Sequence, residues 1–322
     1  MKKRILSLLL AGVMMCSMTA CGGEKDTNAE DVKYKVGVCQ LQQHPALDKA
    51  TDGFMDALEE KLGEEVSINV QYANGDSNTC STITNTFVAN EYDLILGNAT
   101  AALQAAVSST AEIPILGTSI TDYATALGMD DWTGKSGKNV SGTTDLAPLD
   151  KQAECIKELF PEAKKIGILF CSAEPNSQYQ SKVISEYLTT MGYTCKEYTF
   201  SDTNDVAQIT QGACDESDVI YIPTDNTAAN CTEAINNVAL NAGVPIFAGE
   251  EGICSGCGVA TLSIDYYEIG YIAGEMAYDI LVNDANPATM EVKSAPEVTK
   301  KYNVTNATEL EVTIPDSYTA IE

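Results

Sequence analysis

The sequence predicts an α/β protein of two similar lobes, each built on a doubly wound parallel sheet and joined by a hinge. Three short segments of the first half recur in the same order in the second. The pairs are 35–38 with 165–168, 93–96 with 218–221, and 113–117 with 244–249. Each is an apolar, β-branched run that ends in small or polar residues before a helix-like stretch, which is typical of parallel strands buried on both faces. A cleft between two such lobes is a usual place for a small molecule to bind.

The first lobe is expected to begin with a strand at 36–39 and a helix at 48–62, in which Phe54, Leu58 and Leu62 fall at helical spacing. A strand at 66–72 ends in the polar segment 74–77, and a helix follows through residue 88. Strands at 94–96 and 113–116 end in further polar and small residues. The pattern therefore alternates strand and helix, as a parallel sheet requires.

The second half repeats this order with strands at 166–170, 219–222 and 245–248. The chain is expected to pass between the lobes at 140–145, near 260–265 before a helix at 267–282, and at 293–305. A final strand is predicted at 309–313. Residues 33–142 with 264–295 would then form the N-terminal lobe, and residues 143–263 with 296–322 the C-terminal lobe.

The N-terminus has the pattern of a bacterial export signal. A basic cluster at 2–4 precedes an apolar run at 5–15, which is shorter than a bilayer requires. Cys21 follows small residues as in a lipobox, so residues 1–20 are interpreted as a lipoprotein signal peptide and Cys21 as the lipidated N-terminus. A plain secretory peptide is the alternative. Residues 21–32 are polar and acidic, and are expected to be a flexible tether on the extracytoplasmic face of the cell membrane.

The charge of the chain excludes whole classes of partner. The formal net charge is −27, and it becomes −30 when residues 1–20, with three basic groups and no acidic one, are removed. Such a surface repels nucleic acid and anionic lipid headgroups. We expect no nucleic-acid binding, and membrane contact only through the lipid anchor.

Eleven cysteines would suggest disulfide bonds in an exported protein. Cys16 is lost with the signal and Cys21 is assigned to lipid, so nine remain and at least one is unpaired. Cys254 and Cys257 have the spacing of a metal or redox motif, but no second pair follows and His44 is the only histidine. They are placed in a glycine-rich loop, as a disulfide or as two free thiols, and no metal or other cofactor is expected.

Polar residues follow the predicted strands in both halves, at the sheet edge where parallel sheets bind ligands. Hydroxyls, amides and free helix N-termini suit a carboxylate, and acidic side chains suit an ammonium group. Phosphate would require Arg or Lys, which these loops almost lack; a sugar or nucleoside remains an alternative ligand. The candidate ligand-binding residues are Gln43, His44, Asn98, Thr100, Ser119, Asp122, Ser172, Glu174, Asn176, Ser177, Thr224, Asp225, Asn226, Glu250 and Asp265.

Several of these residues have an equally ordinary structural interpretation. Asp225 and Asn226 can cap the helix that follows them, and Thr100, Ser119, Ser172 and Ser177 can do the same at their own helices. A cap at a cleft edge can also contact ligand. Asp225 is expected to be the main counter-charge to a ligand ammonium, with Glu250 the second choice.

The segments 35–48 (KVGVCQLQQHPALD), 223–227 (PTDNT), 248–252 (AGEEG) and 264–270 (IDYYEIG) resemble the ABC-transporter substrate-binding lipoproteins grouped with tryptophan and tyrosine uptake systems. The resemblance covers about residues 33–315. It implies a type I periplasmic-binding-protein fold with three passages between lobes, and capture of an amino acid, often aromatic, for a membrane permease. A ligand sensor on the same fold is an alternative.

An enzyme is disfavoured by the motifs. The sequence has no histidine near a Ser or Cys nucleophile motif, no P-loop and no cluster of metal ligands. We therefore expect a non-enzymatic, monomeric binding protein.

Overall fold

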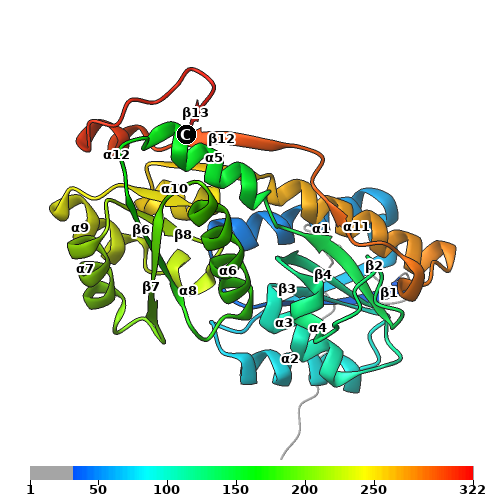
Figure 1. Ribbon diagram of the computed structural model, residues 1–322. Helices are drawn as coiled ribbons and strands as arrows, with labels where there is room; N and C mark the ends of the chain where they lie inside the picture. Colours follow the sequence, from blue (N-terminus) through cyan, green and yellow to red (C-terminus); the bar gives the residue numbers. More distant parts are fainter. Residues whose placement is uncertain (1–31, 322) are drawn as a thin grey trace, which may run out of the picture. The chain divides into compact units, whose positions relative to one another are not determined.

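Two sheets, each with helices on both faces, organise residues 32–321, the part of the chain that this computed structural model describes (Figure 1). The first sheet has the strand order β2-β1-β3-β4-β5-β11, and all its neighbouring strands are parallel. Its strands are β1 (Tyr34–Gln40), β2 (Val66–Tyr72), β3 (Leu94–Asn98), β4 (Ile115–Ile120), β5 (Val140–Thr144) and β11 (Lys293–Ser294).

Two apolar cores lie against the two faces of this sheet. On one face, Val36 and Leu94 pack with Phe54 of α1 and Met276 of α11. On the other, Ile95 packs with residues of α2 and α3. The helices around this sheet are α1 (Pro45–Leu62), α2 (Ser77–Ala89), α3 (Thr100–Ser109), α4 (Tyr123–Leu127) and α11 (Tyr266–Asn283), with short 3-10 turns η1 (Gly63–Glu65) and η2 (Pro287–Thr289).

The second sheet has the order β7-β6-β8-β9-β10-β12-β13, in which only the β10–β12 pair is antiparallel. Its strands are β6 (Lys165–Cys171), β7 (Thr194–Phe200), β8 (Val219–Ile222), β9 (Ile246–Ala248), β10 (Ala260–Ile264), β12 (Val298–Tyr302) and β13 (Thr319–Ala320). The helices are α5 (Leu149–Leu159), α6 (Pro175–Thr190), α7 (Val206–Glu216), α8 (Asn226–Ala229), α9 (Thr232–Ala242), α10 (Glu251–Cys257) and α12 (Val304–Glu309). This sheet also has an apolar core on each face.

The repeat in the sequence is a repeat in the fold. The segments that recur form β1 and β6, β3 and β8, and β4 and β9, and each pair holds the same place in its sheet. The first five strands of each lobe follow the order 2-1-3-4-5 of a doubly wound sheet, whose ligands bind where the order reverses, between the first and third strands. The predicted fold class is confirmed.

The chain passes between the two sheets three times. It leaves the first sheet after β5, returns after β10 through Asp265, and leaves again between β11 and β12. The strand predicted at 309–313 is wrong. Helix α12 ends at Glu309, Glu311 takes a positive φ of 52°, and the last strand pairs only at 319–320.

Other boundaries also differ from the sequence-based expectation. Helix α1 begins at Pro45, three residues before Asp48, because proline fits the first turn of a helix, where its missing N–H is not needed. Cys254 and Cys257 lie in helix α10 and not in a glycine-rich loop. All nine cysteines between residues 32 and 321 are free thiols. Within the same residues, no helix is both long and apolar enough to cross a membrane.

Helices α1 and α11 pack with their backbones in contact. A Cβ added at Gly53 would overlap the carbonyl oxygen of Tyr267, and one at Gly270 would overlap that of Ala50. A Cβ added at Gly274 would likewise lie only 2.6 Å from Cβ of Ala57. This packing fixes the direction of α1, whose first turn lies at the cleft between the lobes.

Candidate functional site

A cavity of about 20 Å³ lies between the two lobes, and its walls come from both sheets and from the passages between them. We call it the inner cavity. It is lined by His44, Leu47, Ser119, Thr121, Asp145, Asn176, Thr224, Asp225, Asn226, Ala229, Glu250, Ile253 and Tyr266. Most of these residues lie at the carboxyl ends of strands or in the first turn of the helix that follows. This is the space of about one water molecule, so the walls of the cavity must move apart to admit a larger ligand.

Three buried carboxyl groups dominate the electrostatics of the inner cavity. Asp145, Asp225 and Glu250 are exposed by 6%, 2% and 3%. Among residues 32–321, no lysine or arginine lines this cavity, and the only arginine in the sequence is Arg4. The cavity therefore lacks a positive charge to balance its acids.

Burial raises the pKa of all three acids, because it penalises the charged form. It raises the pKa of Asp145 above its ordinary value and that of Glu250 to about 7. The pKa of Asp225 is raised by burial and by the neighbouring charge of Glu174. A cation in the cavity would relieve this strain and restore the ionised forms.

The three carboxyl groups differ in what holds them. Asp145 accepts hydrogen bonds from two hydroxyl groups, Thr121 Oγ1 at 3.1 Å and Tyr266 Oη at 2.9 Å. Among residues 32–321, no backbone N–H of another residue donates to its side chain. Because hydroxyl groups can rotate, this carboxylate is the one best able to adjust to a ligand.

Asp225 and Glu250 are held by backbone donors. Asp225 caps α8 by accepting from Ala228 N at 2.7 Å, and its other oxygen accepts from Cys171 N, also at 2.7 Å. Glu250 caps α10 by accepting from the backbone N–H groups of residues 252 and 253. Both residues therefore have a structural function, and each oxygen retains a lone pair for a further donor.

Two residues that line the inner cavity each have a buried polar atom with no hydrogen-bond partner among residues 32–321. The hydroxyl of Ser119 and Nδ1 of His44 are both buried and unpaired. Ser119 has a positive φ of 56° and lies where the pairing of β4 with β5 shifts register, between Gly117 and Ile120. Unusual backbone of this kind clusters at ligand sites, and here it places an unpaired hydroxyl at the cavity wall.

Helix α1 begins at the inner cavity without a side-chain cap. Its N-cap residue is His44, which makes no capping hydrogen bond, and Pro45 has no N–H. Leu47, in the first turn, lines the cavity. Free N–H groups and the helix dipole make such an N-terminus favourable for a carboxylate.

The lobes contact each other around the inner cavity. Gln42, after β1, donates to the backbone oxygen of Asn226 and accepts from the side chain of Asn230. His44 Nε2 lies 3.3 Å from Asn226 Oδ1. These contacts join the first lobe to α8 of the second, so the lobes are closed on each other.

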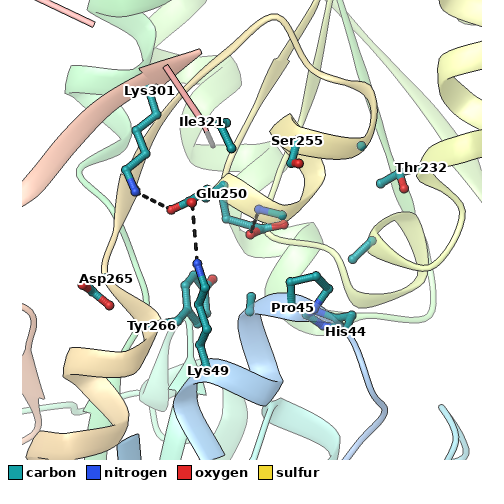
Figure 2. A pocket seen from close by; sticks show the side chains of 15 residues that line it. His44, Pro45, Lys49, Thr232, Glu250, Ser255, Asp265, Tyr266, Lys301 and Ile321 are labelled. Atoms are coloured by element: carbon teal, nitrogen blue, oxygen red, sulfur yellow. Dashed lines mark hydrogen bonds and ion pairs between the residues drawn. The ribbon is translucent and has the colours of Figure 1, made fainter. Parts of the chain in front are cut away.

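A larger pocket of about 390 Å³ lies beside the inner cavity and shares His44, Ala229, Glu250 and Tyr266 with it (Figure 2). We call it the outer pocket. Lys49 of α1 and Lys301 of β12 both form ion pairs with the carboxylate of Glu251, at 3.6 and 2.6 Å. The Lys49–Glu251 pair spans the two lobes.

The candidate residues from the sequence separate into those that line the inner cavity and those that do not. The first group is His44, Ser119, Asn176, Thr224, Asp225, Asn226 and Glu250. Asp265 caps α11 and lines the outer pocket. Glu174 accepts hydrogen bonds from residues 226 and 227 at the start of α8.

The remaining candidates are engaged elsewhere. Asn98 donates to Leu47 O within the first lobe, and Asp122 caps α4. Thr100 and Ser177 are buried in α3 and α6, Ser172 donates to Phe200 O, and Gln43 is exposed. None of Thr100, Ser119, Ser172 and Ser177 is the N-cap of a helix, so that interpretation is wrong for all four.

Other residues that line the inner cavity were not among the candidates, namely Leu47, Thr121, Asp145, Ala229, Ile253 and Tyr266. Asp145 and Tyr266 lie at the first and second passages between lobes. The sequence predicted both passages. Because such passages lie at the base of a cleft, the polar residues at them could have been identified as candidate binding residues. Leu47, Ala229 and Ile253 are apolar and carried no signal of their own.

Residues 35–321 match the family described as ABC transporter substrate binding protein. The chain belongs to this family. A protein from Clostridioides difficile (strain R20291) named tyrosine-binding protein is 38% identical over 291 residues, which are 87% of this chain and 84% of the relative.

Solved structures agree with this assignment. A domain from Streptococcus pneumonia in complex with L-Trp has a TM-score of 0.85 and 31% identity, and the match covers 90% of this binding protein and 100% of that chain. A ligand-free, open substrate-binding protein from Clostridium difficile has a TM-score of 0.70 and 33% identity, covering 90% and 99%. The present arrangement of the lobes is thus more similar to the ligand complex than to the open form. Members of this family are extracytoplasmic.

Proposed function

We propose that this binding protein captures an aromatic L-amino acid at the inner cavity, which widens to admit it, and delivers it to the permease of an ABC importer. The observation that carries the proposal is the set of three buried carboxyl groups around one small cavity that no lysine or arginine of residues 32–321 lines. A buried group of acids without a cation selects for a ligand that brings one. An α-ammonium group meets that requirement, whereas a neutral sugar does not.

The ammonium is assigned to the space beside Asp145 and Glu250. Each of these acids raises the free energy of ionising its neighbour, since the negative charge of Asp145 contributes to the raised pKa of Glu250. A cation between them removes that repulsion. Asp225 is further stabilised by two backbone donors and is the second choice, which reverses the order of preference that the sequence suggested.

The ligand carboxylate is assigned to the hydroxyl of Ser119 and the uncapped start of α1. Ser119 Oγ is buried without a partner, and α1 presents its positive end at the same cavity. With no arginine after Arg4, a guanidinium clamp is not available to this chain. A helix N-terminus and a hydroxyl can perform that function.

The aromatic side chain is inferred from the relatives and from the apolar walls. The two relatives at 38% and 31% identity are named for tyrosine and for a complex with L-Trp. In this chain Leu47, Ala229 and Ile253 provide apolar surface at the inner cavity, and Tyr266 adds a ring. These groups can pack against an aromatic ring.

The test is a thermal-shift screen followed by calorimetry. The Cys21→Ala protein would be screened against the twenty amino acids, several sugars and nucleosides, because a ligand that binds only the folded state raises its apparent stability. We expect the largest shifts with L-tyrosine or L-tryptophan. Saturable binding of a sugar, with no heat from any amino acid, would contradict the proposal.

We further propose that residues 1–20 are a signal peptide, that Cys21 is lipidated, that residues 21–32 are a tether, and that the protein acts as a monomer. Residues 1–31 lie outside the described residues, so the support is the sequence pattern alone. Replacing Cys21 with alanine should release the protein from the membrane fraction. Retention in the membrane at unchanged length would refute the anchor.

A further inference from the structure

Glu174 fixes the orientation of the Asn226 side chain. One carboxylate oxygen of Glu174 accepts from Asn226 N at 3.0 Å and from Asn226 Nδ2 at 2.7 Å. The other accepts from Thr227 N and Thr227 Oγ1, both at 2.8 Å. An ionised carboxylate only accepts hydrogen bonds. The amide nitrogen of Asn226 must therefore face Glu174, and its oxygen must face away.

The oxygen of that amide in turn fixes the tautomer of His44. Asn226 Oδ1 lies 3.3 Å from His44 Nε2, across the cleft. Because an amide oxygen cannot donate, Nε2 must carry the proton. Burial lowers the pKa of His44, against the opposing charges of Asp48 and Glu174, so the ring is neutral at pH 7.

A neutral ring with its proton on Nε2 has a bare lone pair on Nδ1. That atom is buried and has no hydrogen-bond partner within the described residues, 32–321. It belongs to a residue that is 7% exposed and lines both the inner cavity and the outer pocket. It can only accept a hydrogen bond. The α-ammonium is already matched by Asp145 and Glu250, so Nδ1 is available for a second donor on the ligand.

We propose that His44 determines ligand specificity by accepting a hydrogen bond through Nδ1 from a side-chain O–H or N–H of the ligand, with Asn226 and Glu174 as positioning residues that fix its tautomer. The inference rests on the proposed amino-acid ligand and deepens it. It selects aromatic amino acids that carry a donor, as a phenol or an indole does, over phenylalanine, which has none. It also makes selection depend on closure, because Asn226 and His44 belong to different lobes.

The tautomer can be measured directly because His44 is the only histidine in the chain. Protein labelled with ¹⁵N-histidine gives one imidazole spectrum, in which the protonated and bare nitrogens have separate shifts. At pH 7 we expect the Nε2–H tautomer, and a shift of Nδ1 on addition of L-tyrosine or L-tryptophan but not L-phenylalanine. A proton on Nδ1, or an imidazolium at pH 7, would overturn the inference.

Variants separate this function from a purely structural one. Asn226→Ala removes the group that fixes the ring, so a mixture of tautomers is expected. Asn230→Ala is the matched control, since it also removes a bond between the lobes, to Gln42, without contacting His44. It should weaken all ligands alike and leave the tautomer unchanged. In Glu174→Gln the Asn226 amide can turn round, and signal from the Nδ1–H tautomer should appear.

Affinity provides the second measurement. Leaving a buried acceptor unpaired should make L-phenylalanine bind about 10- to 100-fold more weakly than L-tyrosine to the wild type, and His44→Ala should abolish that preference. Equal losses for both ligands in His44→Ala would show that Nδ1 contacts a group they share, and would refute the inference. If neither L-tyrosine nor L-tryptophan binds, the proposed function fails. In that case the inference is tested by the imidazole spectrum of His44 in the ligand-free wild type and in ligand-free Asn226→Ala. Identical spectra for the two proteins would contradict it.

Discussion

Replacing Asp145 with asparagine should weaken ligand binding strongly without destabilising the ligand-free protein. Asparagine has the same shape as aspartate, and both partners of Asp145 are hydroxyl groups, from Thr121 and Tyr266. A hydroxyl can donate to the amide oxygen or accept from the amide nitrogen. The substitution therefore removes the charge while every hydrogen bond can still be made.

The expected loss follows from the charge that is removed. A carboxylate and an ammonium about 4 Å apart interact by roughly 4 kcal/mol at the effective dielectric typical of protein sites. Removing one member of a buried pair costs about 3–5 kcal/mol, so Kd should rise by about 100- to 3,000-fold. Isothermal calorimetry with L-tyrosine or L-tryptophan would measure it.

The stability of the ligand-free variant should change in the opposite direction. Burial raises the pKa of Asp145 in the folded protein, so ionisation of this group opposes folding. That penalty is absent below its unfolded pKa, near 3.8, and grows as pH rises through the folded value. Asp145→Asn should therefore have a Tm at pH 8 equal to or above that of the wild type, with the difference vanishing near pH 4.

The matched control is Asp122→Asn, which makes the same chemical change at a half-buried helix cap outside the inner cavity. Asparagine is also a good N-cap. The affinity of this variant should change by less than about threefold, because Asp122 does not line the inner cavity and its partly exposed charge is screened by solvent and salt. If Asp145→Asn bound the ligand as tightly as the wild type, or lost no more affinity than Asp122→Asn, Asp145 would not be the counter-charge.

Three further outcomes are expected. The pKa of Glu250 is raised to about 7 from 4.5, so ionisation of Glu250 opposes folding of the ligand-free protein but favours a bound cation. As pH rises from 5 to 8, the affinity for the ligand should increase, while ionisation of Glu250 lowers the Tm of the ligand-free protein. An affinity that calorimetry shows to be independent of pH would argue against an ammonium group beside Glu250. Asp225→Asn, unlike Asp145→Asn, should lower the Tm of the ligand-free protein. One of the two backbone N–H groups that donate to Asp225 would then face an amide nitrogen, which costs the folded protein about 1–3 kcal/mol of stability. An unchanged Tm in a thermal scan would contradict this. Lys49→Met should weaken binding by less than about fivefold, because the Lys49 side chain is 52% exposed and such pairs contribute about 0–1 kcal/mol. A larger loss would identify the pair as a determinant of closure.

The fold was predictable because its signals are local and repeated. Parallel strands buried on both faces need continuous apolar runs, and the paired segments supplied them twice in the same order. The position of the site followed, since polar residues at the carboxyl ends of β1 and β4 in one lobe and of β8 and β9 in the other were expected to face each other across the cleft. His44, Ser119 and Glu250 were found in this way.

The functions of individual acids were not predictable because capping and ligand binding use the same residue types. Asp122, Asp225 and Glu250 each cap a helix, yet only two of them line the inner cavity. Asp145 was missed because its neighbours are distant in sequence, with Tyr266 being 121 residues away. Cys254 and Cys257 were misplaced because the adjacent glycines suggested a loop, although α10 tolerates Gly252 and Gly256 within a short buried helix.

The backbone contact between α1 and α11 has a mechanical consequence. Gly53 and Gly270 leave no space for one helix to slide along the other, so the two must rotate together as a rigid body. His44 precedes this pair at the cleft, while Tyr267 of α11 is 39% exposed on the outside. Closing the inner cavity therefore reorients an exterior surface by the same angle. A partner that contacts both lobes from outside can distinguish a loaded protein from an empty one without touching the ligand.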